Sequence, residues 1–250
     1  MKRLIAALQF LTVCPFVSRV ACDERDIGRS TPWFPLVGFL IGAAVMLLDR
    51  AMSMWFPPLL CSAIAVVALA GASGGLHADG LADTADGFLS SRPRERMLEI
   101  MRDSHTGAMG VLGMICVFSL KLTALASVPA VLRSPALLLM PFAGRCSMVI
   151  QLAMLPYARS GGLCSVFVQN RRRSDVVSTL FVLAAVSWLA GGAYGLCAAT
   201  VSCTVIAIFS LWSRSKIGGF TGDTLGAGCE LVEIIPAMVA AFCWRAMGSL

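Results

Sequence analysis

Residues 176–212 read VVSTLFVLAAVSWLAGGAYGLCAATVSCTVIAIFSLW, a run without a single charged side chain. A helix needs about 20 apolar residues to cross the roughly 30 Å hydrocarbon core of a bilayer, so this run is too long for one span. Gly191, Gly192 and Gly195 offer a turn near its middle. We therefore predict two membrane-spanning helices here, joined at these glycines.

The composition of the whole chain agrees with a membrane protein. Of 250 residues, 58% are apolar and 14% are charged, and the mean hydropathy is +0.81. A soluble domain carries about 25% charged residues, so a soluble enzyme and a disordered or fibrous chain are excluded. Further spans are predicted near residues 33–48, 58–76, 107–128, 135–156 and 231–248. The expected fold is all-α, a polytopic integral membrane helical bundle of about seven transmembrane helices in a single domain, 1–250.

The N-terminal segment differs from these spans. Residues 1–16 are too short and too weakly apolar to cross a bilayer, and they begin with Lys2 and Arg3. An amphipathic stretch of this kind favours a helix that lies in the membrane interface. We expect an interfacial helix there, with shorter cytoplasmic helices elsewhere.

The basic residues indicate how the chain is oriented. The formal net charge is +6, and fifteen of the 20 Lys and Arg residues fall in segments 1–32, 77–106, 157–175 and 213–230. An excess of Lys and Arg marks cytoplasmic loops, so these segments and the N-terminus are predicted to face the cytoplasm. The charge excess is accordingly not attributed to nucleic acid. Twelve of the 14 acidic residues fall on the same side, and any active site is expected there.

The clearest motif is GGLHADGLADTADG at residues 74–87. Asp79, Asp83 and Asp86 are spaced i, i+4, i+7, so a helix places all three carboxylates on one face. Carboxylates at a membrane boundary are costly unless they are paired, and hard oxygen ligands suit Mg²⁺ held together with substrate phosphates. The alternative is a solvated helix face. His77 precedes the row, and histidine has the right unperturbed pKa for a general base.

Two further segments on the same side carry candidate binding groups. EIMRDSHTGAMG at 99–110 precedes a long apolar helix, whose N-terminus is a candidate phosphate cradle; the alternative is helix packing by small residues. GGFTGDTLGAGCE at 218–230 spaces Asp223 and Glu230 at i, i+7 and is either a second carboxylate pair or a packing turn. We expect segments 77–106 and 213–230 to form the active site at the cytoplasmic face.

One arginine falls in the middle of a predicted span. An unpaired guanidinium there is costly, so Arg145 is either paired with a buried acid or contacts an anionic substrate. Arg159, at the end of the same span, suits an interfacial anchor. The residues alone thus indicate a membrane transferase that uses Mg²⁺ and a nucleotide-diphospho or prenyl-diphospho substrate.

Three longer motifs resemble those of a known protein family. GGLHADGLADTADG, then RERMLEIMRDSHTG at 94–107, then GFTGDTLGA at 219–227 closely resemble the cobalamin synthase family, also called adenosylcobinamide-GDP ribazoletransferase. The resemblance covers nearly the whole chain, from the LQFLT stretch near the N-terminus to the last span. At position 105 the chain has His where the family more often has a basic residue.

The resemblance implies an activity, a cofactor, partners and a location. Members transfer the adenosylcobinamide-phosphate group of adenosylcobinamide-GDP to α-ribazole or its 5′-phosphate and release GMP, with Mg²⁺ required, in the bacterial inner membrane. A homo-oligomer or an association with other enzymes of cobalamin synthesis is also expected. Asp79, Asp83 and Asp86 would bind metal, with His77 or one of these acids as the base. Substrate-binding residues are expected at Arg102, Asp103, His105, Thr106, Arg145, Arg159, Thr221, Asp223 and Glu230.

Three rival functions stay open. Asp83-x-x-Asp86-Gly87 is shared with the start of the CDP-alcohol phosphotransferase signature, whose second half is missing here. Asp79-x-x-x-Asp83 resembles one half of a membrane prenyltransferase site. An ion-coupled transporter would need its acids near mid-membrane, whereas here they gather at one face.

Overall fold

The computed structural model describes residues 2–14, 20–162 and 164–248, and every regular element in these ranges is a helix. The all-α prediction is confirmed. In chain order the elements are α1 (Lys2–Leu11), α2 (Glu24–Gly28), the 3-10 turn η1 (Thr31–Trp33), α3 (Phe34–Met52), α4 (Pro58–Ala72), α5 (Leu76–Leu89), α6 (Arg94–Ile100), α7 (Ala108–Ala126), α8 (Ala130–Met154), α9 (Cys164–Asn170), α10 (Arg173–Ile217) and α11 (Gly222–Gly248).

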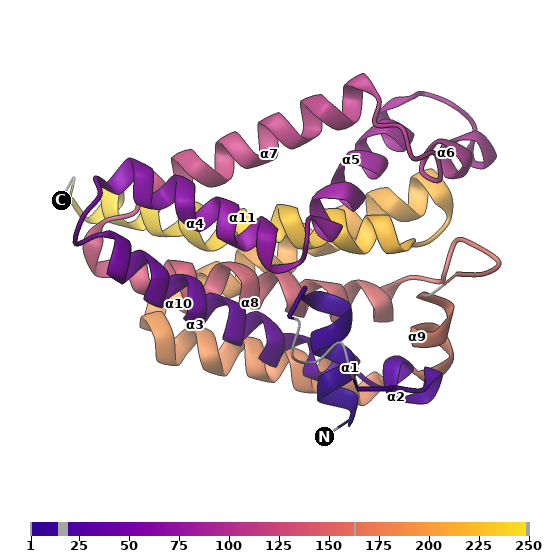
Figure 1. The fold of residues 1–250 in the computed structure, drawn as a ribbon, viewed down its shortest axis with the longest axis horizontal. Coiled ribbons are helices and arrows are strands. Elements are labelled where there is room, and N and C mark those ends of the chain that lie inside the picture. Colours follow the sequence, from indigo (N-terminus) through magenta and orange to yellow (C-terminus); the bar gives the residue numbers. More distant parts are fainter. Residues whose placement is uncertain (1, 15–19, 163, 249–250) are drawn as a thin grey trace.

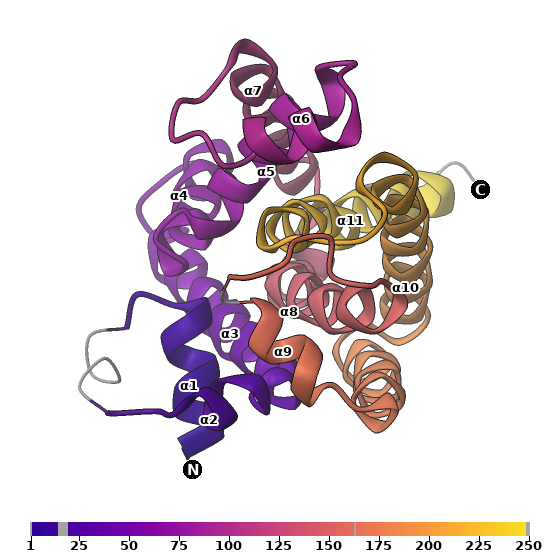
Figure 2. The same cartoon turned by 90° about the vertical axis from the view of Figure 1, so that its right-hand side faces the viewer.

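Helix α8 runs through the centre of the bundle, with α3, α10 and α11 packed around it (Figure 1). Viewed along the bundle, α4, α5 and α7 lie outside this inner group (Figure 2), and α1, α2 and α9 gather toward one end of it (Figure 1). Almost every side chain of α8 from residue 136 to 152 is buried, including Arg145. The helix continues through Pro135 and Pro141, so it begins earlier than the predicted 135–156 span.

Within the described ranges, five helices are long and apolar enough to cross a membrane: the η1–α3 segment, α7, α8, α10 and α11. The α4–α5 pair is bent by 87° and makes a sixth crossing if the pair is taken as one span. The chain is therefore a multi-pass membrane protein. Helix α1 buries Ala6, Ala7 and Leu11 against the bundle. Of the helix predicted over 1–16, residues 1, 15 and 16 lie outside the described ranges.

This count takes residues 173–217 as one helix, whereas the sequence predicts two helices within residues 176–212 and about seven spans in all. Within α10, two helices meet at a kink at Gly192, where φ is 55° and ψ is −131°, as predicted. A Cβ atom on Gly195 would collide with the backbone of Ser187, so the two halves approach each other closely beside the break. Figure 1 shows the halves as separate helical stretches. The break lies among the glycines named from the sequence.

The last span also differs from its predicted bounds. Helix α11 begins at Gly222 rather than near residue 231, because Thr221 caps its first turn. The acidic residues of segment 218–230 therefore lie on a helix and not in a connecting loop.

The end of the bundle where α3 ends and α4 begins is closed by one ion pair. Arg133 of α8 donates from Nε and Nη2 to the two carboxylate oxygens of Asp49 on α3, at 2.9 and 2.6 Å. The same guanidinium donates to Ser62 Oγ on α4 and to the carbonyl oxygen of Leu125 on α7. A bidentate pair with both groups largely buried holds four helices together at this end.

We predict that Gly192→Ala lowers the free energy of unfolding by about 1–3 kcal/mol, because a φ of 55° with this ψ is strained for any residue with a Cβ atom. The added methyl group itself meets no atom within 4 Å, so backbone strain is the whole effect. The measurement is equilibrium unfolding in mixed micelles. The control is Gly71→Ala, which also adds its Cβ in open space but on a regular helix and should leave stability equal or slightly higher. Equal effects of the two changes would contradict this account of the break.

Candidate active site

The acidic row lies on α5 as predicted. Asp79, Asp83 and Asp86 fall on one helix of residues 76–89, which starts after Gly74 and Gly75 adopt positive φ angles. Asp79 is exposed, whereas Asp83 and Asp86 are half-buried. The carboxylates therefore run from the surface into the bundle.

Asp86 has a defined partner, the N-terminus of α7. Its Oδ2 accepts a hydrogen bond from the N–H of Gly107 at 2.7 Å, and its Oδ1 accepts one from the N–H of Gly110 at 2.8 Å. A helix N-terminus stabilises a negative charge, so Asp86 fixes α7 against α5. These two N–H groups, which the sequence assigned to a phosphate cradle, are bound to Asp86.

The N-terminus of α11 is capped by its own residues. The N–H of Thr224 donates to Thr221 Oγ1 at 3.3 Å, and the N–H of Thr221 donates to Thr224 Oγ1 at 2.8 Å. This reciprocal arrangement satisfies two backbone donors at the helix start. Thr221 also donates from Oγ1 to Asp223 Oδ2 at 3.2 Å, which orients that carboxylate.

Helices α5 and α11 cross at two glycines. A Cβ atom on Gly80 would lie 2.7 Å from the carbonyl oxygen of Asp223, and one on Gly226 would lie 3.1 Å from the Cα atom of His77. Small residues allow two membrane helices to approach closely, and larger ones here would force the helices apart. The crossing joins motifs that are far apart in the sequence.

As a result, four carboxylates act on one another. The charges of Asp79, Asp223 and Asp86 all repel the charge of Asp83, in decreasing order. A cation placed among such like charges reduces their repulsion. Arg159 supplies part of this charge, because its Nη2 donates to Asp223 Oδ2 at 2.7 Å.

Backbone contacts hold Arg159 in place. The N–H of Ala158 donates to the carbonyl oxygen of Phe220, and the N–H of Phe220 donates to that of Pro156, both at 2.9 Å. Arg94 of α6 donates to the carbonyl oxygens of Ala158 and Ile217 at 2.9 and 2.8 Å. The segment before Arg159 is thus fixed beside the start of α11, and Arg94 is part of this framework.

A cavity of about 430 Å³ opens where these parts meet. Five predicted site residues line it: His77, Asp79, Arg102, Arg159 and Asp223. Two residues that the sequence did not single out for the site also line it, Tyr157 and Cys164. Burial raises the pKa of the Cys164 thiol to about 11, so the thiol is protonated near neutrality and a poor nucleophile.

The other predicted residues do not line the cavity. Asp83 and Thr221 interact with its acidic lining, as described above, and Asp86 caps α7. Asp103 accepts hydrogen bonds from the N–H and Nδ1 of His105 at 3.0 and 2.7 Å, and the side-chain bond lowers the pKa of the exposed Asp103 carboxyl. Thr106 is exposed in the same loop. The roles assigned to these residues stay predictions.

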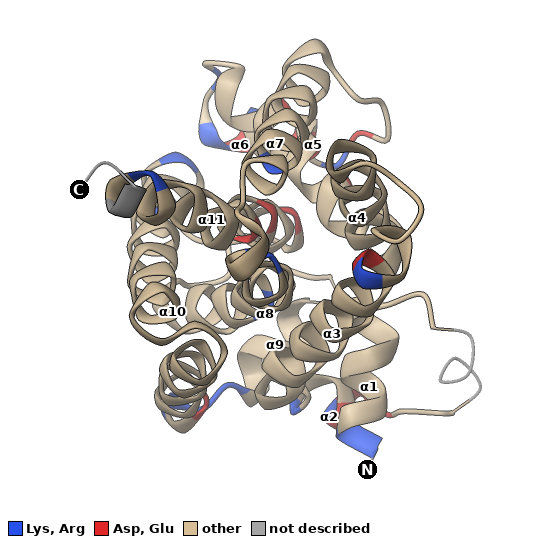
Figure 3. Cartoon of the chain, turned by 90° about the vertical axis from the view of Figure 1, so that its left-hand side faces the viewer, with Lys and Arg blue, Asp and Glu red and all other residues tan. Residues whose placement is uncertain are grey.

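Arg145 and Glu230 lie deeper, in a buried charge network. Lys121 of α7 donates from Nζ to Glu230 at 2.5 Å and to Glu233 at 2.8 Å, and Arg145 of α8 pairs with Glu233. All four side chains are almost completely buried. Charged residues are seen among these interior helices as well as at the ends of the bundle (Figure 3). The ion-pair alternative for Arg145 is confirmed, and Lys121 and Glu233, each a charge inside an apolar span, are the partners that the sequence analysis did not name.

His77 connects this network to the cavity. Its ring is buried, and its Nδ1 lies 3.8 Å from the Sγ atom of Cys229. Its Nε2 has no hydrogen-bond partner among the described residues. The ring thus lies between the charge network and the cavity, and its Nε2 atom is itself buried.

The donor set fits one mode of Mg²⁺ binding. Across the described ranges, no three His, Cys, Asp or Glu side chains are arranged to hold a metal ion by themselves. Mg²⁺, however, is commonly bound by one or two carboxylates together with substrate phosphates. The exposed carboxylate of Asp79, with Asp83 beside it, suits an ion whose shell is completed by a diphosphate.

We predict that Lys121→Met destabilises the protein by about 3–5 kcal/mol, because it leaves Glu230 and part of Glu233 buried without a counter-charge. Adding Glu230→Gln to this variant restores the balance of charge and should recover much of the loss. Unfolding in mixed micelles measures both. An additive or more severe loss in the double variant would contradict the proposed charge compensation.

Comparison with known proteins identifies the family. Residues 3–241 match the family described as cobalamin-5-phosphate synthase. A relative from Acetivibrio thermocellus, named adenosylcobinamide-GDP ribazoletransferase, is 38% identical over 234 residues, covering 92% of this chain and 94% of the relative. Relatives of the same name from Syntrophobacter fumaroxidans and Geotalea daltonii are 38% and 35% identical, each covering at least 94% of this chain and 96% of the relative. No solved structure matches. The chain belongs to the cobalamin-5-phosphate synthase family.

Proposed function

We propose that this protein transfers the adenosylcobinamide-phosphate group of adenosylcobinamide-GDP to α-ribazole or its 5′-phosphate. A ribazole hydroxyl oxygen forms a bond to the cobinamide-linked phosphorus, and the bond from that phosphorus to the bridging oxygen breaks. GMP leaves with the bridging oxygen, and the hydroxyl proton passes to a base. The observation that carries the proposal is the cavity in which Asp79 of α5, the start of α11 and two arginines converge.

The arginines are the groups that bind phosphate. Arg102 and Arg159 both line the cavity, and planar guanidinium groups match phosphate oxygens with two donors. The Nε atom of Arg159 is buried without a hydrogen-bond partner among the described residues. A diphosphate in the cavity would therefore find a donor already positioned by Asp223 and by the carbonyl oxygen of Met101.

The acids of α5 act with Mg²⁺ in this proposal. Asp79 and Asp83 would hold the ion, and both carboxylate oxygens of Asp86 are already bound to the N-terminus of α7. When bound, Mg²⁺ neutralises the charge that develops on the leaving phosphate. His77, through Nε2, or one of the acids takes the proton from the attacking hydroxyl.

The proposed location is the bacterial inner membrane, with the cavity facing the cytoplasm. The cavity lies at the end of the bundle that carries α1, α2 and α9, and most Lys and Arg residues belong to the segments at this end. Cytoplasmic loops carry such an excess of positive charge.

The experiment uses purified protein in liposomes with adenosylcobinamide-GDP, α-ribazole 5′-phosphate and Mg²⁺. GMP and the cobalamin product are separated and quantified, with and without EDTA. We expect one GMP for each cobalamin formed and loss of both products when EDTA is present. Folded protein that produces neither compound would overturn the proposed reaction, and turnover that persists in EDTA would overturn the role of the metal.

Asp83→Asn is expected to lower kcat by about 1000-fold or more, because charge stabilisation by a bound metal contributes several kcal/mol to the transition state. The matched control is Glu95→Gln, which removes a carboxylate that is exposed on α6 and does not line the cavity. Both variants should reach the membrane and melt like the parent protein. Near-parental turnover of Asp83→Asn would remove this residue from the proposed site.

A further inference from the structure

A second, larger cavity lies away from the proposed active site. It is a groove of about 650 Å³ between α3 and the first half of α10, and it shares no lining residue with the active-site cavity. Both walls belong to candidate membrane spans. Lipid hydrocarbon, rather than water, is therefore the ordinary neighbour of this groove.

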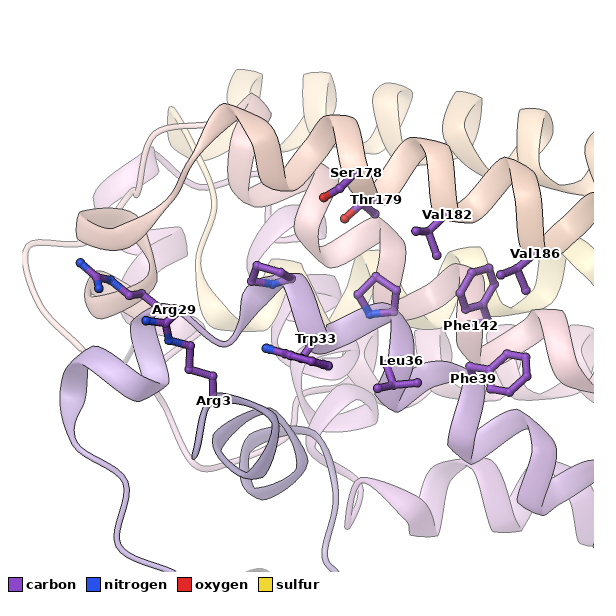
Figure 4. Close-up of a pocket in the computed structure, with 12 residues that line it drawn as sticks. Arg3, Arg29, Trp33, Leu36, Phe39, Phe142, Ser178, Thr179, Val182 and Val186 are labelled. Atoms are coloured by element: carbon purple, nitrogen blue, oxygen red, sulfur yellow. The ribbon is translucent and has the colours of Figure 1, made fainter. Parts of the chain in front are cut away.

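One end of the groove carries two arginines that form no ion pair with any residue the structure describes. Arg3 of α1 and Arg29, which follows α2, line this end, and their side chains point toward the same region (Figure 4). Neither guanidinium forms a hydrogen bond or an ion pair with another described residue. Arginines left without a partner at the mouth of a groove favour an anionic group there.

Polarity falls along the groove from this end. Next to the arginines, Ser178 and Thr179 of α10 present hydroxyl groups opposite Trp33 (Figure 4). Tryptophan with a polar edge beside it is typical of the level at which lipid headgroups meet hydrocarbon. The groove thus passes from charged to weakly polar surface over a short distance.

The rest of the groove, beyond Ser178 and Thr179, is lined by apolar side chains. Leu36 and Phe39 of α3 face Val182 and Val186 of α10, and Phe142 of α8 forms the floor (Figure 4). Leu36 and Val182 are each 37% exposed, so the groove is not filled by the protein's own side chains.

We propose that this groove binds one anionic phospholipid. The phosphate lies between Arg3 and Arg29, the glycerol region lies beside Ser178 and Thr179, and one acyl chain lies against the apolar walls. A free phosphate or nucleotide would leave the apolar part uncovered, and a zwitterionic lipid would leave the net positive charge uncompensated. Since Arg3 and Arg29 belong to the segment before α3, the bound lipid fastens α1 and α2 to the membrane face of the bundle.

The test titrates the detergent-solubilised full chain with phosphatidylglycerol and phosphatidylcholine of identical acyl chains and counts bound lipids by native mass spectrometry. The parent protein should prefer phosphatidylglycerol. Each arginine near an anionic headgroup contributes roughly a fivefold change in affinity, so Arg3→Gln with Arg29→Gln should weaken phosphatidylglycerol binding by about 30-fold. The control, Arg92→Gln with Arg214→Gln, removes the same charge from two exposed arginines outside the groove and should leave binding unchanged.

A second variant tests the apolar part without changing charge. Val182→Trp fills the groove and should reduce binding of both lipids, while the melting temperature shows that the protein remains folded. Equal weakening by the control pair, or equal binding of the two lipids by the parent, would overturn the proposal. Displacement of the bound lipid by millimolar inorganic phosphate would assign the arginines to a soluble anion. Displacement by adenosylcobinamide-GDP would assign the groove to substrate. A dimer of the parent protein that is lost in Val182→Trp would assign the groove to a second copy of the chain. Each of these three results overturns the lipid proposal, and none depends on turnover.

Discussion

The arrangement of the interior helices depends on the mutual neutralisation of two cations and two anions. Lys121, Arg145, Glu230 and Glu233 come from α7, α8 and α11, and each is almost fully buried. A single unpaired charge in this environment would cost several kcal/mol, so the three helices are stable only in a register that brings the four groups together. Apolar packing between membrane helices lacks this selectivity, because lipid tails are as apolar as the side chains they would replace.

The position of α11 set by this charge network also sets the position of the acidic residue that α11 contributes to the proposed active site. Asp223 stands two turns before Glu230 on the same helix, so the pairing of Glu230 with Lys121 also fixes how far Asp223 projects toward α5. The crossing at Gly80 and Gly226 then sets the distance between the two acidic segments. Asp86 completes the connection, because its bonds to the start of α7 join the helix that carries Lys121 to the helix that carries the acids. Lys121, Glu230 and Asp86, which do not line the cavity, thereby help to determine its geometry.

Features set by local sequence could be predicted, and features set by distant contacts could not. The membrane helices follow from runs of apolar residues, the helical row Asp79–Asp83–Asp86 from its spacing, and the break in α10 from adjacent glycines. Arg159 and Asp223 are 64 positions apart in the sequence. Lys121 is 109 and 112 positions from its two glutamates. No local pattern specifies pairs so far apart. The early start of α11 was not predicted either. Gly219 and Gly222, on either side of Thr221, are typical of a turn, whereas the capping hydrogen bonds of Thr221 start a helix there.

The two ends of the bundle show why similar ion pairs serve different purposes. At one end Arg133 binds both oxygens of Asp49 and two further acceptors, which uses most of its donors and leaves little for a ligand. At the other end Arg159 binds a single oxygen of Asp223, keeps an unpartnered Nε and lines an open cavity. A saturated guanidinium stabilises the fold, whereas one with spare donors suits the phosphate contact proposed above for Arg159. Four neighbouring carboxylates and one arginine leave a negative charge at this end, and the Mg²⁺ proposed above would compensate part of it.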